Sequence, residues 1–133
     1  SMIPEVERLA IEKAAGKGES EVQEGVQKAI SKILSPPVLI AVTSTVTPED
    51  DFREMEDYAA TACSVQNLAL SLWDQGIGSQ WSTGGITRSD FVYGALGISP
   101  MEEKIVGFVK AGYPAAIPQR EKKSIAEIRE YLP

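Results

Sequence analysis

Residues 51–85 have the sequence DFREMEDYAATACSVQNLALSLWDQGIGSQWSTGG, and this stretch decides the fold. From Phe52 to Gln75 it contains no glycine or proline, so it predicts an unbroken helix of about seven turns. Along one side, apolar residues recur at the i, i+3, i+4 spacing of a buried face: Phe52, Met55, Tyr58, Ala59, Ala62, Val65, Ala69, Leu72 and Trp73. The opposite side is also small or apolar over residues 58–73. We therefore expect the helix to be covered nearly all round, by its own domain or by a second copy of the chain.

Both ends of this helix are marked, and a small loop rich in glycine follows it. Residues 47–51 offer capping side chains and an acidic first turn, and Gly76 can end the helix in the left-handed conformation. Residues 77–81 then predict a short extended segment. In the loop Trp81-Ser82-Thr83-Gly84-Gly85, two glycines would let the backbone approach a ligand, and hydroxyls and free amides would donate hydrogen bonds. A plain turn without a ligand explains the same residues, so both interpretations stay open on the local sequence.

The composition narrows the class of protein. The chain has 133 residues, which predicts a single domain over residues 1–133, and its net charge of −6 argues against nucleic acid or an anionic membrane surface as a partner. A single cysteine and the lack of a signal-like or membrane-spanning segment predict a reducing, cytoplasmic setting. The lack of histidine excludes a Ser-His-Asp triad and most zinc-ligand sets. Cys63 lies within the apolar helix, where we expect it to fill the core, and no catalytic side chain or metal site is predicted.

The rest of the chain supplies shorter elements. Two helices are predicted over residues 4–15 and 19–34, and the charges on their outer faces are expected only to meet solvent. Apolar runs predict a buried strand over residues 38–43 and a second, central strand over residues 104–113. A short helix is expected over residues 91–96, and a capped one over residues 125–132 in the tail. These elements predict an α+β domain in which helices pack on a small mixed sheet, with the long helix at its centre or at a subunit interface.

Several segments, in this order and spacing, resemble the flavin-dependent nitroreductase family, particularly its small single-domain bacterial members. The segments are SPPVLI at 35–40, YAATACSVQNL at 58–68, QGIGSQWSTG at 75–84, LGI at 96–98, KIVGF at 104–108 and GYP at 112–114. Each motif is weak by itself, but together they are fairly specific. The family's N-terminal segment, with its Arg-Arg-Ser type phosphate clamp, has no counterpart before Pro36. The chain is therefore expected to be either a fragment of a longer enzyme or a naturally short member of the family.

The resemblance implies an obligate homodimer, with the long helix packed against its copy and FMN held at the dimer interface. It implies that the loop formed by Trp81, Ser82, Thr83, Gly84 and Gly85 lies along the flavin. Amides near Thr83 and Gly84 would face flavin N5 and O4, and Ser82 would lie near the ribityl chain. Lys122 and Lys123 would help to hold the FMN phosphate, although a solvated basic pair explains them equally well.

Two functions remain after these steps. The first, implied by the resemblance, is an FMN-dependent oxidoreductase that passes electrons from NAD(P)H to a nitroaromatic, quinone or related small-molecule acceptor by a ping-pong mechanism. The flavin carries most of this chemistry, which suits a chain without histidine. The alternative is a flavin-free dimeric interaction module, which keeps the apolar helix but has no catalytic activity.

Overall fold

The computed structural model describes residues 1–119 and 121–131. Arg120 and Leu132, which the sequence placed in the basic tail and in its helix, lie outside the described residues. The elements in chain order are α1 (Ile3–Lys13), α2 (Glu19–Leu34), β1 (Val38–Thr45), α3 (Asp51–Asp74), β2 (Gly78–Ser82), the 3₁₀ helix η1 (Gly85–Arg88), α4 (Asp90–Leu96), β3 (Glu103–Gly112) and α5 (Ile125–Ile128). No helix among the described residues is long and apolar enough to cross a membrane.

The three strands form one sheet in the order β1-β3-β2. Both pairings are antiparallel, with Ala41 opposite Phe108 in one and Ser82 opposite Phe108 in the other. The prediction of a mixed sheet is therefore wrong in this detail. The reason is topological: α3 carries the chain from one edge of the sheet to the other, so β1 and β2 run in the same direction. The strand that fills the place between them, β3, runs against both.

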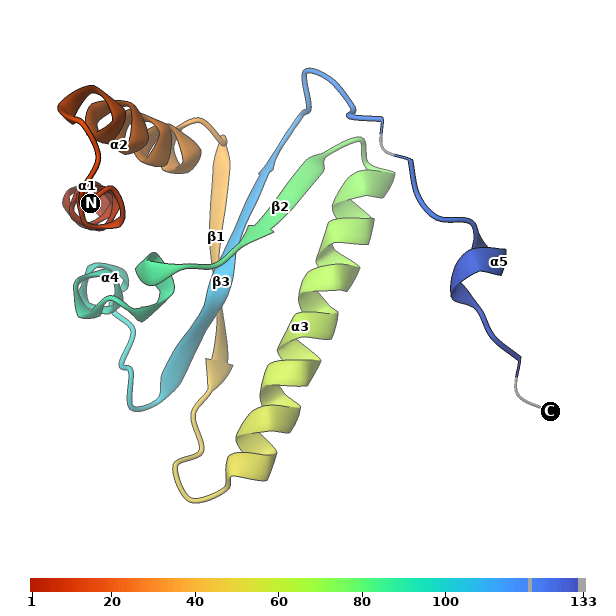
Figure 1. Ribbon diagram of the computed structural model, residues 1–133. Helices are drawn as coiled ribbons and strands as arrows, with labels where there is room; N and C mark the ends of the chain where they lie inside the picture. The colour runs from red at the N-terminus through yellow and green to blue at the C-terminus, as the bar shows by residue number, and fades with distance from the viewer. Residues whose placement is uncertain (120, 132–133) are drawn as a thin grey trace.

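Helices cover both faces of this sheet (Figure 1). The long helix α3 lies on one face, and α1, α2 and α4 lie on the other. The core on the α4 side is built around Phe108 and Val92, and Tyr93 secures it by accepting a hydrogen bond of 2.8 Å from the backbone N–H of Ile105. The central position of β3 confirms the second apolar run as a central strand. The first run, β1, is an edge strand and only half-buried, because an edge strand has a neighbour on one side alone.

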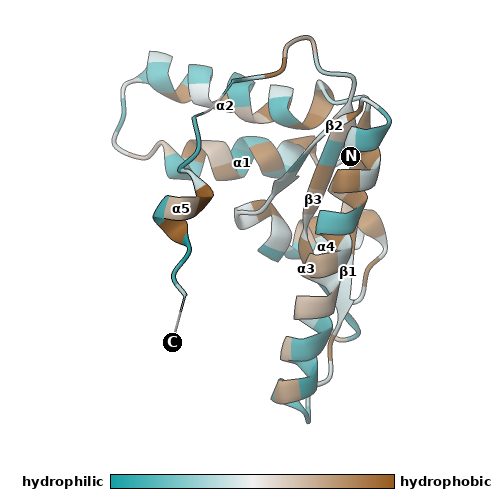
Figure 2. Ribbon diagram, turned by 90° about the vertical axis from the view of Figure 1, so that its right-hand side faces the viewer, coloured by the Kyte–Doolittle hydropathy of each residue, from teal (hydrophilic) through white to brown (hydrophobic). Residues whose placement is uncertain are grey.

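The predicted long helix is confirmed, and α3 begins and ends one residue earlier than expected. The carboxylate of Asp50 caps its start by accepting a hydrogen bond of 2.9 Å from the N–H of Arg53, and Gly76 follows its end with a φ of +74°. Its own domain does not cover this helix nearly all round, since Val65 is the α3 residue that is buried. Cover by a second copy of the chain stays a prediction. Four large apolar side chains on α3 are more than half exposed, namely Phe52, Met55, Leu70 and Trp73. Figure 2 views the molecule from this side and shows apolar segments along α3.

Two smaller predictions also fail. Cys63 is exposed rather than part of the core, because it lies on the outer side of α3. In the tail, α5 ends at Ile128 although a helix to residue 132 was expected, and its residues Ile125 and Ile128 are exposed. So short a helix is marginal unless packing supports it, and in the single chain these apolar side chains have no such cover.

Candidate functional site

A groove with a volume of about 810 Å³ lies on the sheet face opposite α3. Its walls are formed by α1 and α2 on one side, and by β2, the loop after β2 and one residue of β3 on the other. Four of the predicted site residues line it: Ser82, Thr83, Gly84 and Gly85. The volume falls in the range of small-molecule and cofactor pockets. The loop that the sequence singled out therefore lies beside the large concave surface of this face.

The conformation of the loop depends on Gly84. Its φ of +142° is a value that favours glycine, and a Cβ at this position would meet no atom within 4 Å. The carbonyl of Gly84 accepts hydrogen bonds from the Thr87 hydroxyl at 2.8 Å and from the Thr87 N–H at 3.0 Å. Among the described residues, none accepts a hydrogen bond from the N–H of Gly84. The loop is thus fixed through its carbonyl, while one amide remains free to bind a ligand.

The neighbours of Gly84 have more structural roles. The Ser82 hydroxyl donates a hydrogen bond of 3.2 Å to the carbonyl of Phe108, which fixes the end of β2 to the central strand. A Cβ on Gly85 would lie 3.1 Å from a methyl group of Leu9, so the loop approaches α1 closely at this point. The glycine at position 85 is therefore explained by packing against α1, and Gly84 is the glycine that leaves space for a ligand.

The structure separates Trp81 from the other loop residues. Successive side chains of a strand point to opposite faces of the sheet, so Ser82 faces the groove and Trp81 faces the α3 side. There the Trp81 ring lies directly over Gly107, so close that a Cβ on Gly107 would clash with the indole nitrogen. Trp81 is 40% exposed and does not line the groove.

The two tail lysines are also apart from the groove. Lys122 and Lys123 precede α5 in the extended C-terminal segment and are exposed. Figure 1 shows this segment on the α3 side of the sheet, across from α1 and α2. Neither lysine lines the groove in this chain.

Five other lysines line the groove, and the sequence analysis did not single them out. They are Lys13, Lys17, Lys28, Lys32 and Lys110. The groove has two carboxylates beside them, Glu12 and Glu21. The expectation that the charges of the first two helices only meet solvent is therefore incomplete, because these exposed side chains also form a cationic wall. A signal was present in the sequence for two of them, because Lys28 and Lys32 are four residues apart on α2 and so share a helix face. Lys13 ends α1, and Lys17 lies in the turn after it.

The only strand residue among these lysines is Lys110. It lies opposite Gln80 across the β2–β3 pairing, and both side chains line the groove. Partial burial lowers the pKa of Lys110, and the positive charge of Lys32 lowers it further. The cations of α2 and β3 therefore line the same groove.

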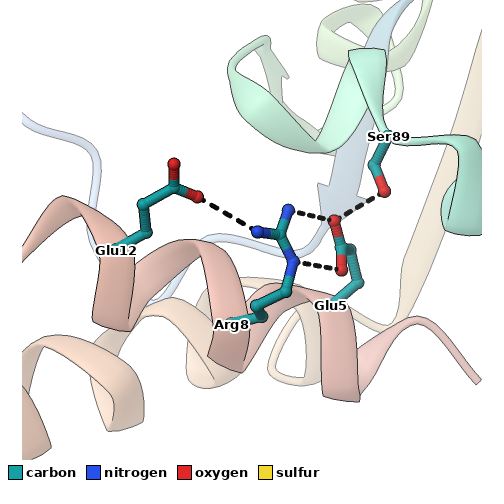
Figure 3. Close-up of polar contacts among 4 residues, drawn as sticks. All are labelled: Glu5, Arg8, Glu12 and Ser89. Carbon is teal, nitrogen blue, oxygen red and sulfur yellow. Dashed lines mark hydrogen bonds and ion pairs between the residues drawn. The ribbon is translucent and has the colours of Figure 1, made fainter.

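A buried carboxylate holds α1 in place as one wall of the groove (Figure 3). Glu5 accepts a hydrogen bond of 2.6 Å from the Ser89 hydroxyl and two of 2.8 Å from the guanidinium of Arg8. Arg8 also contacts Glu12, at 3.1 Å. The hydrogen bonds from Arg8 and Ser89 lower the pKa of Glu5 to about 2. Since Ser89 lies at the start of α4, this contact joins the first helix to the second half of the chain.

Within the described part of the chain, no group of three or more His, Cys, Asp or Glu side chains is placed to hold a metal ion. The chemistry that the groove offers is therefore that of hydrogen-bond donors and ammonium groups. Such a surface suits an anionic ligand that also carries polar atoms for the loop to bind.

Comparison with known proteins gives a consistent result. A model of the nitroreductase family matches residues 5–113. The Bacillus subtilis protein named "Putative NAD(P)H nitroreductase YfhC" is 33% identical over 76 residues, which cover 57% of this chain and 39% of that protein. The Escherichia coli K12 protein named "Putative NAD(P)H nitroreductase YdjA" is 28% identical over 89 residues, which cover 67% of this chain and 48% of that protein. The chain thus spans less than half the length of either relative.

Solved structures resemble the chain over more of its length. A nitroreductase-like family protein from Bacillus cereus has a TM-score of 0.69 at 25% identity, covering 98% of this chain and 67% of its own. A Desulfovibrio desulfuricans protein described as a "putative nitroreductase in complex with fmn" has a TM-score of 0.60 at 22% identity, covering 84% of this chain and 60% of its own. A nitroreductase with bound FMN from Bacteroides fragilis has a TM-score of 0.57 at 20% identity, covering 97% and 70%.

Proposed function

The chain belongs to the nitroreductase family, and on that premise we propose that it is an FMN-dependent oxidoreductase. It would pass electrons from NAD(P)H to a nitroaromatic, quinone or related acceptor by a ping-pong mechanism. The names of two relatives as NAD(P)H nitroreductases, and the FMN in two structures of the same fold, support this proposal. The observation that carries it is the position of residues 82–85 along a groove lined by lysines.

The residues of the groove fit FMN by their chemistry. The free N–H of Gly84 and the hydroxyl of Thr83 would donate hydrogen bonds to polar atoms of the ring, and the lysines would neutralise the phosphate. When bound, the flavin supplies the hydride and electron transfer itself, so the chain needs no acid or base of its own. The task of its residues is to bind, to orient and to stabilise negative charge. An amide N–H beside a ring that gains charge on reduction does this without rearranging.

We also propose that the chain forms a homodimer through the outer side of α3. Phe52, Met55, Leu70 and Trp73 leave a run of apolar surface along that helix, and exposed surface of this kind is a mark of an interface. The groove lies across the sheet from this helix, so the two surfaces can be changed independently.

A flavin-free interaction module is the second candidate, and the same apolar side of α3 supports it. This surface would join two copies whether or not the groove holds a ligand. The two candidates differ in one respect that can be measured, namely whether the groove binds a flavin.

The visible absorbance of the purified protein tests the proposal most directly. It would be recorded before and after addition of FMN, and again after desalting. Retained flavin bands that bleach on addition of NADH or NADPH, and return with a quinone, are the expected result. The variant Gly84→Val is the matched control, because a β-branched side chain strains this φ and fills the space beside the free amide. A colourless wild-type protein that keeps its dimer would contradict the proposal and favour the interaction module.

A further inference from the structure

The carbonyl of Gly84 is held at two points by one residue, Thr87. The Thr87 hydroxyl donates a hydrogen bond of 2.8 Å to this carbonyl oxygen, and the Thr87 backbone N–H donates a second hydrogen bond of 3.0 Å to the same atom. A carbonyl oxygen has two lone pairs, so these two hydrogen bonds use its full accepting capacity. The peptide group between Gly84 and Gly85 is therefore fixed in orientation by Thr87.

Gly84 needs such a restraint, because little else limits its conformation. Its φ is +142°, and a Cβ built at this position would meet no described atom within 4 Å, so its surroundings are loosely packed. Glycine also loses more conformational freedom on folding than any other residue. The two hydrogen bonds from Thr87 supply the restraint that packing does not, and they keep Gly84 in one conformation at the wall of the groove.

Thr87 is itself firmly placed, and it lies behind the groove rather than in it. Its residue is 8% exposed, and η1, which contains it, packs against α1, α4 and β3. Two residues further on, the Ser89 hydroxyl donates the hydrogen bond of 2.6 Å to Glu5 that joins this segment to α1 (Figure 3). Thr87 does not line the groove. An effect of Thr87 on a ligand in the groove must therefore pass through the loop.

We propose that Thr87 is a positioning residue, which holds the N–H of Gly84 ready to donate a hydrogen bond to the ligand in the groove. The inference rests on the proposed function for the identity of that ligand, a flavin. A donor that is already oriented stabilises negative charge without rearranging, so it favours the reduced, more negative form of the ligand over the oxidised form. Loss of the Thr87 hydroxyl should therefore lower the midpoint reduction potential of the bound flavin.

The experiment compares the wild-type protein with Thr87→Val and Thr87→Ser. Valine has nearly the shape of threonine and keeps the backbone N–H bond to Gly84, but it lacks the hydroxyl, which serine retains. The matched control is Thr61→Val, because the Thr61 hydroxyl also donates a hydrogen bond of 2.8 Å to a backbone carbonyl, that of Asp57, on α3 across the sheet from the groove. Thr87→Ala is a second variant without the hydroxyl, which keeps the test open if Thr87→Val folds poorly.

Two quantities would be measured: the NMR order parameter of the Gly84 N–H in protein without flavin, and the midpoint potential of bound FMN. We expect Thr87→Val to lower the order parameter from about 0.85 towards about 0.6. We also expect its affinity for reduced FMN to fall about threefold more than its affinity for oxidised FMN. For a two-electron couple, this difference lowers the midpoint potential by about 15 mV. Thr87→Ser and Thr61→Val should stay close to the wild type in both measurements.

Three results would overturn the inference. The first is a Thr87→Val protein that keeps the wild-type order parameter or the wild-type potential. The second is a Thr87→Ser protein that behaves like Thr87→Val, because the methyl group and not the hydroxyl would then hold the loop. The third is an equal change in Thr61→Val, which would indicate a general loss of stability.

The same data separate this inference from the proposed function. Wild-type protein that binds no flavin would contradict the proposed function, and the order parameters would still decide whether Thr87 holds the loop. Wild-type protein that binds and reduces FMN, with both quantities unchanged in Thr87→Val, would overturn the inference and leave the proposed function intact.

Discussion

The two faces of the sheet are both covered by helices, but the covers leave surfaces of opposite chemistry. On one face, α3 buries Val65 against the sheet and leaves Phe52, Leu70 and Trp73 outside. On the other face, α1 and α2 enclose a groove in which lysines outnumber carboxylates. An apolar surface is completed by another apolar surface, and a cationic groove by an anion. The comparison indicates that one face of this fold is suited to a second protein chain and the other to a small charged ligand.

The largest expected effect comes from breaking the apolar side. The double variant Leu70→Glu/Trp73→Glu places two charges where α3 would meet its copy. Each large apolar side chain contributes about 1.5–3 kcal/mol on burial, so we expect the association constant of the dimer to fall at least about a hundredfold. Sedimentation velocity over a range of concentrations measures this constant.

Gln23→Glu is the control for this variant, because it adds a charge to an exposed position of α2 on the other side of the sheet. Gln23→Glu should leave the association constant of the dimer unchanged. A wild-type protein that is monomeric at micromolar concentration would contradict the hypothesis that α3 forms an interface between two copies of the chain.

The second test compares two glycines that lie on opposite faces. Gly107→Ala would drive a Cβ into the Trp81 ring on the α3 side, and Gly84→Ala would strain a φ of +142° beside the groove. Each should cost about 1–3 kcal/mol in the free energy of unfolding, the first by overpacking and the second by backbone strain. Urea denaturation measures both. Flavin binding distinguishes them, since Gly84→Ala should weaken it more at equal loss of stability, and the opposite ranking would show that Trp81 contributes to the site.

These two glycines also show what the sequence could and could not predict. The uninterrupted run before Gly76 was enough to place the long helix, and the family resemblance was enough to predict the nitroreductase-like fold, which the structural likenesses confirm. It was harder to predict to which face of the sheet each side chain points. The predicted strand ended at residue 81, whereas β2 extends to Ser82. Placing both residues in one strand would have shown that Trp81 and Ser82 point in opposite directions.

Apart from the shared helix face of Lys28 and Lys32, the lysine groove could not be predicted from the local sequence. Lys110 lies in an apolar run, and whether it faces a helix or solvent depends on its pairing with Gln80, which is 30 positions earlier in the chain. The lysines of α1 and α2 resemble an ordinary solvated face until those helices are placed across the groove from β2. The direction of strand pairing has the same non-local origin, which is why the sheet was predicted to be mixed.

The third prediction concerns the contact that holds α1 against the groove. The pKa of Glu5 is lowered to about 2 by Arg8 and Ser89, from an ordinary value of 4.5. A carboxyl with a lowered folded-state pKa contributes stability above its ordinary pKa and loses it as the pH falls towards the folded value. We therefore expect the stability of the wild type to fall between about pH 4.5 and pH 2, and Glu5→Gln to lose much of this dependence.

Urea denaturation of both proteins at neutral and acid pH measures the effect. Glu7→Gln, on the same helix, is the control for removal of a carboxylate. If the free energy of unfolding fell in parallel with pH for the wild type and Glu5→Gln, Glu5 would not anchor α1. The groove wall formed by α1 would then depend on apolar packing alone.

The smallest expected effect concerns the tail. The family resemblance implied that Lys122 and Lys123 help to bind the FMN phosphate. In the structure both lysines are exposed and lie outside the groove. If the groove lysines hold the phosphate, Lys122→Gln/Lys123→Gln should change FMN affinity by less than about twofold, because exposed charges at a distance are largely screened by salt. Calorimetric titration of the double variant with FMN measures this change in affinity. A large loss of FMN affinity in this double variant would mean that the tail reaches a groove in the assembled protein. Because the tail lies on the α3 side of the sheet, away from the groove of its own chain, that groove would be the one on a second copy, and the two surfaces contrasted above would then form a single site (Figure 1).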